Sequence, residues 1–378
     1  MKNIFYIILL VTGIYAQFDW QDDGAPIRQG LHIEWQRTGD ANSDGTMIYA
    51  WSDCRNGVRD VVVQKVDLNG NNLWGDYGIV AVNAEGRQED PQLVTDGTGG
   101  AYIIWMDYRD ETDAEGDIYA QHVLSDGSLA WESELALVDQ SGQQSSPNIC
   151  SDGDGGAYVI WKDNTTSTYG DIYAKHVLSD GSLAWGTEGL ALINQSGQQS
   201  SPNICSDGQG GAYVIWKDNT TSSYGDIYAT HLSSEGAIAP GQGVPIITYS
   251  SYRSSPSLNT GGSGEAVLVW SDDRNTDEDL YAQRISVGDN TINTEWGDGG
   301  TLVCGASGEQ TSPRVSQYDE DNTIITWEDG RNGNTDAYYQ ILNGSGNGIL
   351  TDEGFSASTG DWQIIKPRVK AGNAVAYI

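Results

Sequence analysis

Three histidines are the first candidates for acid–base chemistry, because histidine titrates near neutral pH. His122, His176 and His231 each end the same segment, Asp-Ile-Tyr-Ala-x-His. A catalytic histidine is normally unique in its fold, whereas a residue copied into three repeats is explained by a strand position that tolerates imidazole. We therefore expect structural rather than catalytic roles for these histidines.

Carboxylates are abundant, with 53 acidic against 19 basic residues and a net charge of −34. A retaining glycosidase needs two carboxyl groups about 5.5 Å apart, but at this abundance such a pair arises by chance. The sialidase Asp-box, Ser-x-Asp-x-Gly-x-Thr-Trp, is absent, as are Gly-x-Ser-x-Gly, His-Glu-x-x-His and Cys-x-x-Cys. The sequence accordingly assigns no catalytic and no cofactor-binding residue.

Two acidic segments, Asp107 to Asp117 and Asp272 to Asp279, are dense enough to supply the several oxygen ligands that calcium takes. Neither segment has the spacing of an EF-hand loop. In a third acidic turn, Asp154 becomes Gln209 one repeat later. We therefore predict no cofactor and no metal ligand, and keep calcium as the alternative.

The most regular pattern is Trp-x-Asp, which occurs six times at intervals of 54, 56, 55, 54 and 57 residues. We expect the tryptophan to end a strand and pack between repeats, and the aspartate to cap the turn that follows. Both are assigned to the structure and not to a ligand site. The motif residues are Trp51, Asp53, Trp105, Asp107, Trp161, Asp163, Trp216, Asp218, Trp270, Asp272, Trp327 and Asp329.

An arginine stands two residues after this aspartate in four copies, and a threonine in the other two. A second aspartate opens the next expected strand, as Asp279 does after Arg274. We expect the arginine to bridge both carboxylates in a bidentate pair. The residues at the arginine position are Arg55, Arg109, Thr165, Thr220, Arg274 and Arg331.

A period of about 55 residues indicates a unit that stacks on its neighbours. In the third copy, two β-rich runs at 147–151 and 157–161 flank the turn Asp152 to Gly156. Further short runs follow at 171–178 and 190–193, without a helical stretch. Four strands per repeat predict a blade of a β-propeller, whereas separate sandwich domains would need roughly 100 residues each.

We therefore predict an all-β propeller of four-stranded antiparallel blades, with six complete repeats and a seventh split between the termini. Residues 20–27 resemble 185–192, so the chain would start with a fourth strand that completes the last blade. We interpret the sequence as part of a longer reading frame with at least seven blades. The expected repeats are 28–83, 84–139, 140–194, 195–248, 249–305 and 306–360, and residues 361–378 with 17–27 form the incomplete closing blade.

Residues 1–16 have the pattern of a secretory signal peptide, with one lysine and an apolar run at 4–11 that is too short for a permanent membrane anchor. The propeller would then occupy 17–378 and be secreted or displayed at the cell surface. Four cysteines are present, of which Cys150 and Cys205 stand at equivalent repeat positions. Because a disulfide needs Cα atoms within about 7 Å, we predict buried free thiols.

The charge also limits the class of partner. Nucleic acid is excluded, because phosphate binding needs a basic stripe, and anionic membrane surfaces are disfavoured. Acidic residues spread through loops are typical of a solvated, self-repelling surface.

Three segments carry a family resemblance: Gly-Gly-Ala-Tyr-Val-Ile-Trp-Lys-Asp, Asp-Ile-Tyr-Ala-Lys-His-Val and Gly-Ser-Leu-Ala-Trp. Through them the chain resembles exported bacterial β-propeller repeat proteins over residues 17–378. The resemblance implies surface display or release, often with a C-terminal sorting domain for type IX secretion.

Two functions are compatible with this organisation. We predict a non-catalytic binding or adhesion scaffold whose loops contact an extracellular carbohydrate or protein of unknown identity. The alternative is a propeller-type carbohydrate-active enzyme, either a glycoside hydrolase or a sialidase-like protein. An enzyme should present convergent carboxylates and non-repeated aromatic residues, whereas a scaffold should present repeat-equivalent side chains.

Overall fold

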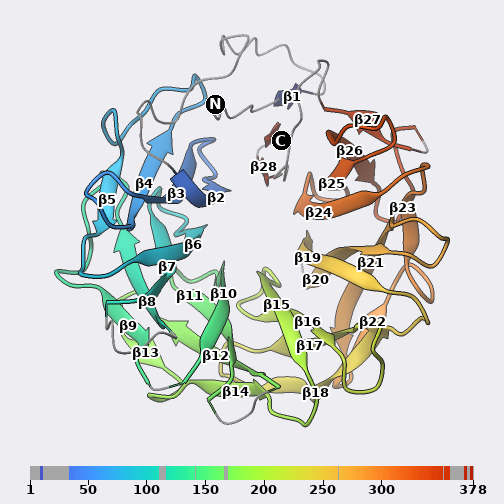
Figure 1. The fold of residues 1–378 in the computed structure, drawn as a ribbon, viewed down its shortest axis with the longest axis horizontal. Coiled ribbons are helices and arrows are strands. Elements are labelled where there is room, and N and C mark those ends of the chain that lie inside the picture. The colour runs from blue at the N-terminus through green and yellow to red at the C-terminus, as the bar shows by residue number, and fades with distance from the viewer. Residues whose placement is uncertain are drawn as a thin grey trace. The chain divides into compact units, whose positions relative to one another are not determined.

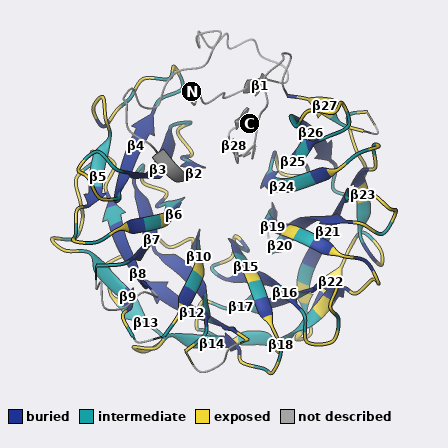
Figure 2. Cartoon of the chain, viewed as in Figure 1, coloured by how far each residue is buried: buried dark blue, intermediate teal, exposed yellow. Residues whose placement is uncertain are grey.

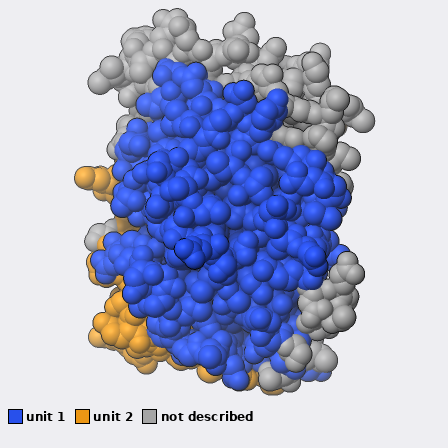
Figure 3. Space-filling view, turned by 90° about the vertical axis from the view of Figure 1, so that its left-hand side faces the viewer, with its two compact units in different colours: residues 1–7, 13–191 blue, residues 8–12, 192–378 orange. Residues whose placement is uncertain are grey.

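The computed structural model describes residues 9–11, 34–109, 116–140, 142–165, 169–262, 264–351, 353–357, 370–372 and 375–377. All regular secondary structure within these ranges is β-strand (Figure 1). None of it is a helix long and apolar enough to cross a membrane. Two compact units divide the chain: residues 1–7 with 13–191 form unit 1, and residues 8–12 with 192–378 form unit 2 (Figure 3).

Unit 1 holds three antiparallel blades whose strands follow the chain order. Blade 1 is β2 (Glu34–Ala41), β3 (Met47–Asp53), β4 (Asp60–Val66) and β5 (Ile79–Val82). Blade 2 is β6 (Gln88–Thr95), β7 (Ala101–Asp107), β8 (Asp117–Val123) and β9 (Leu135–Val138). Blade 3 is β10 (Gln144–Ser151), β11 (Ala157–Asp163), β12 (Asp171–Val177) and β14 (Leu190–Ile193), with the short β13 (Leu183–Ala184) also paired to β12.

Unit 2 holds three further blades of the same antiparallel order. Blade 4 is β15 (Gln199–Ser206), β16 (Ala212–Asp218), β17 (Asp226–Leu232) and β18 (Ile238–Ile247). Blade 5 is β19 (Arg253–Gly262), β20 (Glu265–Asp272), β21 (Asp279–Gly288), β22 (Thr291–Thr294) and β23 (Thr301–Cys304). Blade 6 is β24 (Gln310–Gln317), β25 (Thr323–Asp329), β26 (Asp336–Leu342) and β27 (Phe355–Ser356).

Six blades of this kind confirm the predicted all-β propeller fold. Within each unit the first strands of successive blades lie next to one another: β6 lies between β2 and β10, and β19 lies between β15 and β24 (Figure 1). The second and third strands are the most buried, as in β4 and β7 (Figure 2). The apolar core therefore lies between neighbouring blades of a unit.

The repeated tryptophans occupy this core at the predicted second-strand positions. Trp51 is 5% exposed and the other five are fully buried. Trp105 packs with residues of blade 1, including Val61, and Trp270 with residues of blade 4, including Ile227. The expected burial of the tryptophans between repeats is confirmed.

Glycine turns connect the strands, as the sequence predicts. In the turn after β10, Asp152 Oδ1 accepts hydrogen bonds from the backbone N–H groups of Asp154 and Gly156, both at 2.8 Å. Gly153 and Gly155 each adopt φ +85°, a left-handed conformation that costs glycine little. One aspartate side chain therefore sets the shape of the hairpin.

A small three-stranded sheet in unit 2, separate from its three blades, joins segments from the two ends of the chain. The strand β1 (Leu9–Val11) pairs with β29 (Val375–Tyr377), which pairs with β28 (Lys370–Gly372). The pairing strand at the N-terminal end thus comes from within the predicted signal segment. The predicted orphan strand at residues 17–27 lies outside the described residues, so the split seventh blade stays a prediction.

Candidate ligand-recognition site

Each blade contains the same polar framework where its second strand ends. The indole Nε1 of Trp270 donates a hydrogen bond to Asp272 Oδ2 at 3.1 Å, and the backbone N–H of Arg274 donates to Asp272 Oδ1 at 3.0 Å. The equivalent indole–carboxylate distance in the other blades is between 2.7 and 3.4 Å. One buried carboxylate therefore fixes the tryptophan and caps the following turn.

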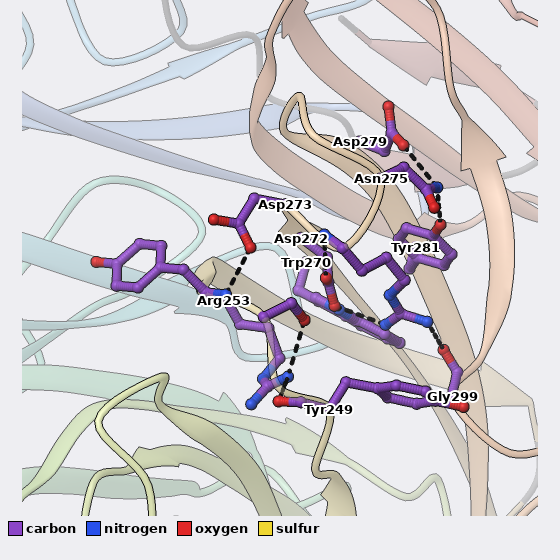
Figure 4. Close-up of polar contacts among 12 residues, drawn as sticks. Tyr249, Arg253, Trp270, Asp272, Asp273, Asn275, Asp279, Tyr281 and Gly299 are labelled. Atoms are coloured by element: carbon purple, nitrogen blue, oxygen red, sulfur yellow. Dashed lines mark hydrogen bonds and ion pairs between the residues drawn. The ribbon is translucent and has the colours of Figure 1, made fainter.

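The arginine of the motif has different partners from those predicted. Arg274 donates to Asp272 Oδ2 at 2.6 Å and to the Gly299 carbonyl at 3.1 Å, and its guanidinium lies over Tyr281 and Tyr249 (Figure 4). Stacked between these rings, it does not bridge the second aspartate.

The second aspartate is instead held by an asparagine. Asn275 Nδ2 donates to Asp279 Oδ2 at 3.0 Å, and Asn56 donates to Asp60 in the same way at 2.9 Å. The prediction that the arginine bridges both carboxylates is therefore wrong for Arg274 and for Arg55. The physical reason, seen in blade 5, is that Asp272, the Gly299 carbonyl and two tyrosine rings already hold the Arg274 guanidinium.

The two aspartates of blade 5 differ in electrostatics. Burial alone would raise the pKa of Asp272, but hydrogen bonds from Arg274, Ser251 and Trp270 outweigh burial and leave that pKa lowered. Burial raises the pKa of Asp279, and the neighbouring carboxylate of Asp277 adds to the increase.

The loops at this end of the blades form what we call the loop face: the connections from second to third strands and from fourth strands to the next blade. On the loop face of unit 2, three exposed tyrosines lie on the two loops that Arg253 connects, and we call them the tyrosine cluster: Tyr224, Tyr249 and Tyr252, which are 45%, 43% and 46% exposed. The backbone N–H of Tyr252 donates to Asp273 Oδ1 at 2.6 Å, and Lys217 Nζ lies 4.1 Å from the centre of its ring. Cations thus lie over the rings of Tyr249 and Tyr252, and each ring is still partly exposed.

Arg253 is buried and binds the backbone of the loops that carry the cluster. Its side chain is fully buried and donates to Asp226 Oδ1 at 2.6 Å and to the Tyr249 carbonyl at 2.8 Å. Its backbone N–H donates to the Tyr224 carbonyl at 3.3 Å. One guanidinium thereby links the two loops that carry the exposed tyrosines.

A half-buried carboxyl group, Glu278, lies beside the cluster. Ser254 Oγ donates to Glu278 Oε1 at 3.4 Å. Burial is the main cause that raises the pKa of Glu278, and the carboxylates of Glu309 and Asp273 add to it, while Lys217 opposes them. A carboxyl group with a raised pKa can hold or donate a proton closer to neutral pH.

The cluster departs from the repeat pattern. Position 252 is glutamine in the two preceding repeats, where Gln143 accepts from Asn164 and Gln198 from Asn219. In blade 5 the corresponding pair is Tyr252 with Asp273. Sequence reasoning missed this site, and the available signal was this change from the pair that blades 3 and 4 share.

The three repeated histidines all bind the aspartate of a glycine turn in their own blade. His122, His176 and His231 place Nε2 at 2.9, 2.8 and 2.7 Å from an Oδ2 atom of Asp96, Asp152 and Asp207, respectively. Because a carboxylate only accepts, each Nε2 carries the hydrogen. The rings stack or tilt against Tyr102, Tyr158 and Tyr213.

The cysteines are free thiols in this structure. Cys150, Cys205 and Cys304 are buried, whereas Cys54 is half-buried. Burial raises the pKa of Cys304 to about 12. The predicted burial holds for three of the four residues.

No group of three or more His, Cys, Asp or Glu side chains in the described ranges could hold a metal ion. Residues 110–115 of the first acidic segment lie outside these ranges. In the second acidic segment, Asp272, Asp273 and Asp279 each accept a hydrogen bond from a different residue. These three carboxylates therefore do not converge on one point.

Comparison with known proteins places the fold but not a family. No family model and no curated protein matches the sequence. A lectin from Burkholderia pseudomallei is similar in structure, with a TM-score of 0.63 and 11% identity over 92% of this chain and 96% of that chain. An α-L-arabinanase from Penicillium chrysogenum, complexed with arabinobiose, has a TM-score of 0.52 and 13% identity over 84% of this chain and 96% of that chain.

A puromycin hydrolase is also similar, with a TM-score of 0.54 and 12% identity. The match covers 87% of this chain but only 46% of the hydrolase, so the chain spans about half the length of that protein. At these identities the likeness establishes the propeller fold alone.

Proposed function

We propose that this protein is an exported carbohydrate-binding propeller in which the tyrosine cluster of unit 2 contacts the sugar. The observation that carries the proposal is the set of three exposed tyrosines on loops connected by a buried arginine, with the polar side chains of Lys217, Asp273 and Glu278 nearby. Aromatic faces stack on the apolar faces of sugar rings, and carboxylates accept hydrogen bonds from sugar hydroxyls.

The structural likeness to a lectin and to an arabinanase supports a carbohydrate ligand for this fold. The net charge of −34 favours a ligand without negative charge, because an anionic glycan would be repelled. Export and cell-surface display are part of the proposal and rest on the segment 1–16 and on the family resemblance.

A glycan array probed with the secreted protein tests this function, followed by a hydrolysis screen of every glycan that binds. We expect stable binding that Tyr252→Ala weakens and that leaves the glycan intact. If only protein partners are retained and no glycan binds, the carbohydrate proposal is wrong.

A glycoside hydrolase is the second candidate, favoured by Glu278. This carboxyl group has a raised pKa, lies near Asp273, and stands where the repeat pattern is broken, as expected of a catalytic site. Turnover of an array hit that Glu278→Gln abolishes would establish the enzyme and reject the non-catalytic scaffold.

A further inference from the structure

Two buried aspartates form no ion pair with a cationic side chain among the described residues, although the charge of Arg55 acts on Asp60 from a distance. Asp60 opens β4 and is fully buried, and its Oδ1 atom has no hydrogen-bond partner in the described part of the chain. Asp279 opens β21 and is 5% exposed. Within the described ranges, neither forms an ion pair with lysine, arginine or histidine, and each accepts only from a neutral asparagine. Burying a carboxylate without a countercharge is unfavourable.

Across the blade boundary, a glutamine binds the backbone of the residue that precedes each of these aspartates. The backbone N–H of Gln88 donates to the carbonyl of Arg59, which precedes Asp60, at 2.7 Å. The backbone N–H of Gln310 donates to the carbonyl of Glu278, which precedes Asp279, at 2.8 Å. Both glutamines are fully buried.

The orientation of each glutamine amide follows from its donors. Gln88 Nε2 donates to the Glu85 carbonyl at 3.1 Å, and Gln310 Nε2 donates to the Gly308 carbonyl at 2.9 Å. The Oε1 atoms of both glutamines are buried and have no partner among the described residues. At each boundary, a buried amide oxygen without a donor thus belongs to a glutamine whose backbone binds the residue next to an aspartate that forms no ion pair.

At the boundary between blades 4 and 5, Arg253 occupies the position that Gln88 and Gln310 have at the other two boundaries. It is the first residue of β19, as Gln88 is of β6 and Gln310 of β24. Its guanidinium donates to Asp226 Oδ1 at 2.6 Å and to the Gly225 carbonyl at 3.1 Å. Asp226 is the counterpart of Asp60 and Asp279, so here the chain itself supplies the positive charge.

We propose that the Asp60–Gln88 and Asp279–Gln310 boundaries each bind a metal cation that prefers oxygen ligands, in the place that the Arg253 guanidinium takes beside Asp226. One carboxylate oxygen and one amide oxygen come from these side chains, and backbone carbonyls or water supply the remainder. Calcium and sodium ions share this ligand preference. The sites are distinct from the exposed acidic loops, and the proposal does not depend on carbohydrate binding.

Thermal unfolding of the chelator-treated protein tests the proposal, with calcium, sodium or tetramethylammonium chloride added at equal ionic strength. We expect calcium or sodium to raise the Tm by about 2–4 °C relative to tetramethylammonium, which screens surface charge but is too large to coordinate. The double variant Gln88→Arg/Gln310→Arg should lose this specific increase, because each arginine supplies the charge internally.

The reverse substitution, Arg253→Gln, provides a gain-of-site control. It should lower the Tm in tetramethylammonium and recover part of that loss in calcium or sodium, which gives a larger specific increase than in the wild type. If neither metal cation raises the Tm above tetramethylammonium, or if the double variant retains the full increase, the proposal is wrong and the oxygens are satisfied by water or a proton.

Discussion

The indole–carboxylate pair at the end of each second strand joins packing and polar structure in one residue pair. The tryptophan buries a large apolar area between blades, and its single N–H would be costly there without an acceptor. The aspartate provides that acceptor and uses its other oxygen to cap the turn. Both residues of the motif therefore have structural partners in every blade.

Arg274→Ala should lower the free energy of unfolding by about 1–3 kcal/mol, because the variant leaves the buried Asp272 without its cation. The wild-type side chain is 16% exposed and lies between two tyrosine rings. Chemical denaturation measures the loss. Arg87→Ala is the matched control, since that side chain is 52% exposed and should contribute less than about 1 kcal/mol.

Acid should weaken the histidine-bound turns. Burial works to raise the pKa of Asp207, but hydrogen bonds from His231 and from the backbone of Gln209 and Gly211 outweigh it and leave that pKa lowered. A carboxyl group with a lowered folded-state pKa stabilises the fold above its unfolded pKa of about 3.9, and this contribution is lost as the pH falls through the folded-state value.

The Tm of the wild type should therefore fall below about pH 4, and Asp207→Asn should show a smaller fall over the same range. Differential scanning calorimetry between pH 2 and pH 7, roughly the span of carboxyl titration, measures both profiles. Parallel profiles for the two proteins would show that this carboxylate does not contribute to acid sensitivity.

At the scale of the elements, a glycine in or just before the fourth strand approaches five of the six repeated tryptophans, all except Trp105. Gly189 has φ +85°, and a Cβ built there would lie 2.7 Å from the Trp161 ring and 2.7 Å from the Ala174 carbonyl. Gly153 has the same φ but nothing within 4 Å of such a Cβ. The two glycines therefore separate backbone strain from steric overlap.

Gly189→Ala should destabilise the protein by about 1–3 kcal/mol more than Gly153→Ala, since both meet the left-handed backbone penalty but only the first overlaps its neighbours. Urea denaturation of the two variants gives the difference. Equal losses would mean that the strand segment relaxes away from Trp161 without cost.

The blade pattern could be predicted from sequence because it is periodic, and glycine turns with Trp-x-Asp mark each strand end. The stacking of Arg274 on Tyr249 could not be predicted, because Tyr249 belongs to another loop. The two side chains meet only when blades 4 and 5 have packed together. The same holds for Glu278 and Tyr252, whose environment comes from three separate loops. Local patterns specify the elements, while the site depends on packing between them.

At the scale of the whole molecule, a repeated framework carries a surface that differs from blade to blade. The buried residues are nearly interchangeable, as in blades 3 and 4, whereas the exposed pair above them changes from Gln198 with Asn219 to Tyr252 with Asp273. Such a division lets loops vary without disturbing the core. It supports recognition at the loop face of unit 2.

Isothermal titration of a glycan identified on the array, with the wild type and Tyr252→Ala, tests this central claim most directly. We predict a Kd roughly five- to tenfold higher for the variant, because it loses one stacking face worth about 1–1.4 kcal/mol. Phe355→Ala is the control, since that ring is 46% exposed on β27, outside the cluster, and its removal should leave the Kd unchanged. An unchanged Kd for a folded Tyr252→Ala variant would contradict the assignment of the tyrosine cluster as the carbohydrate site.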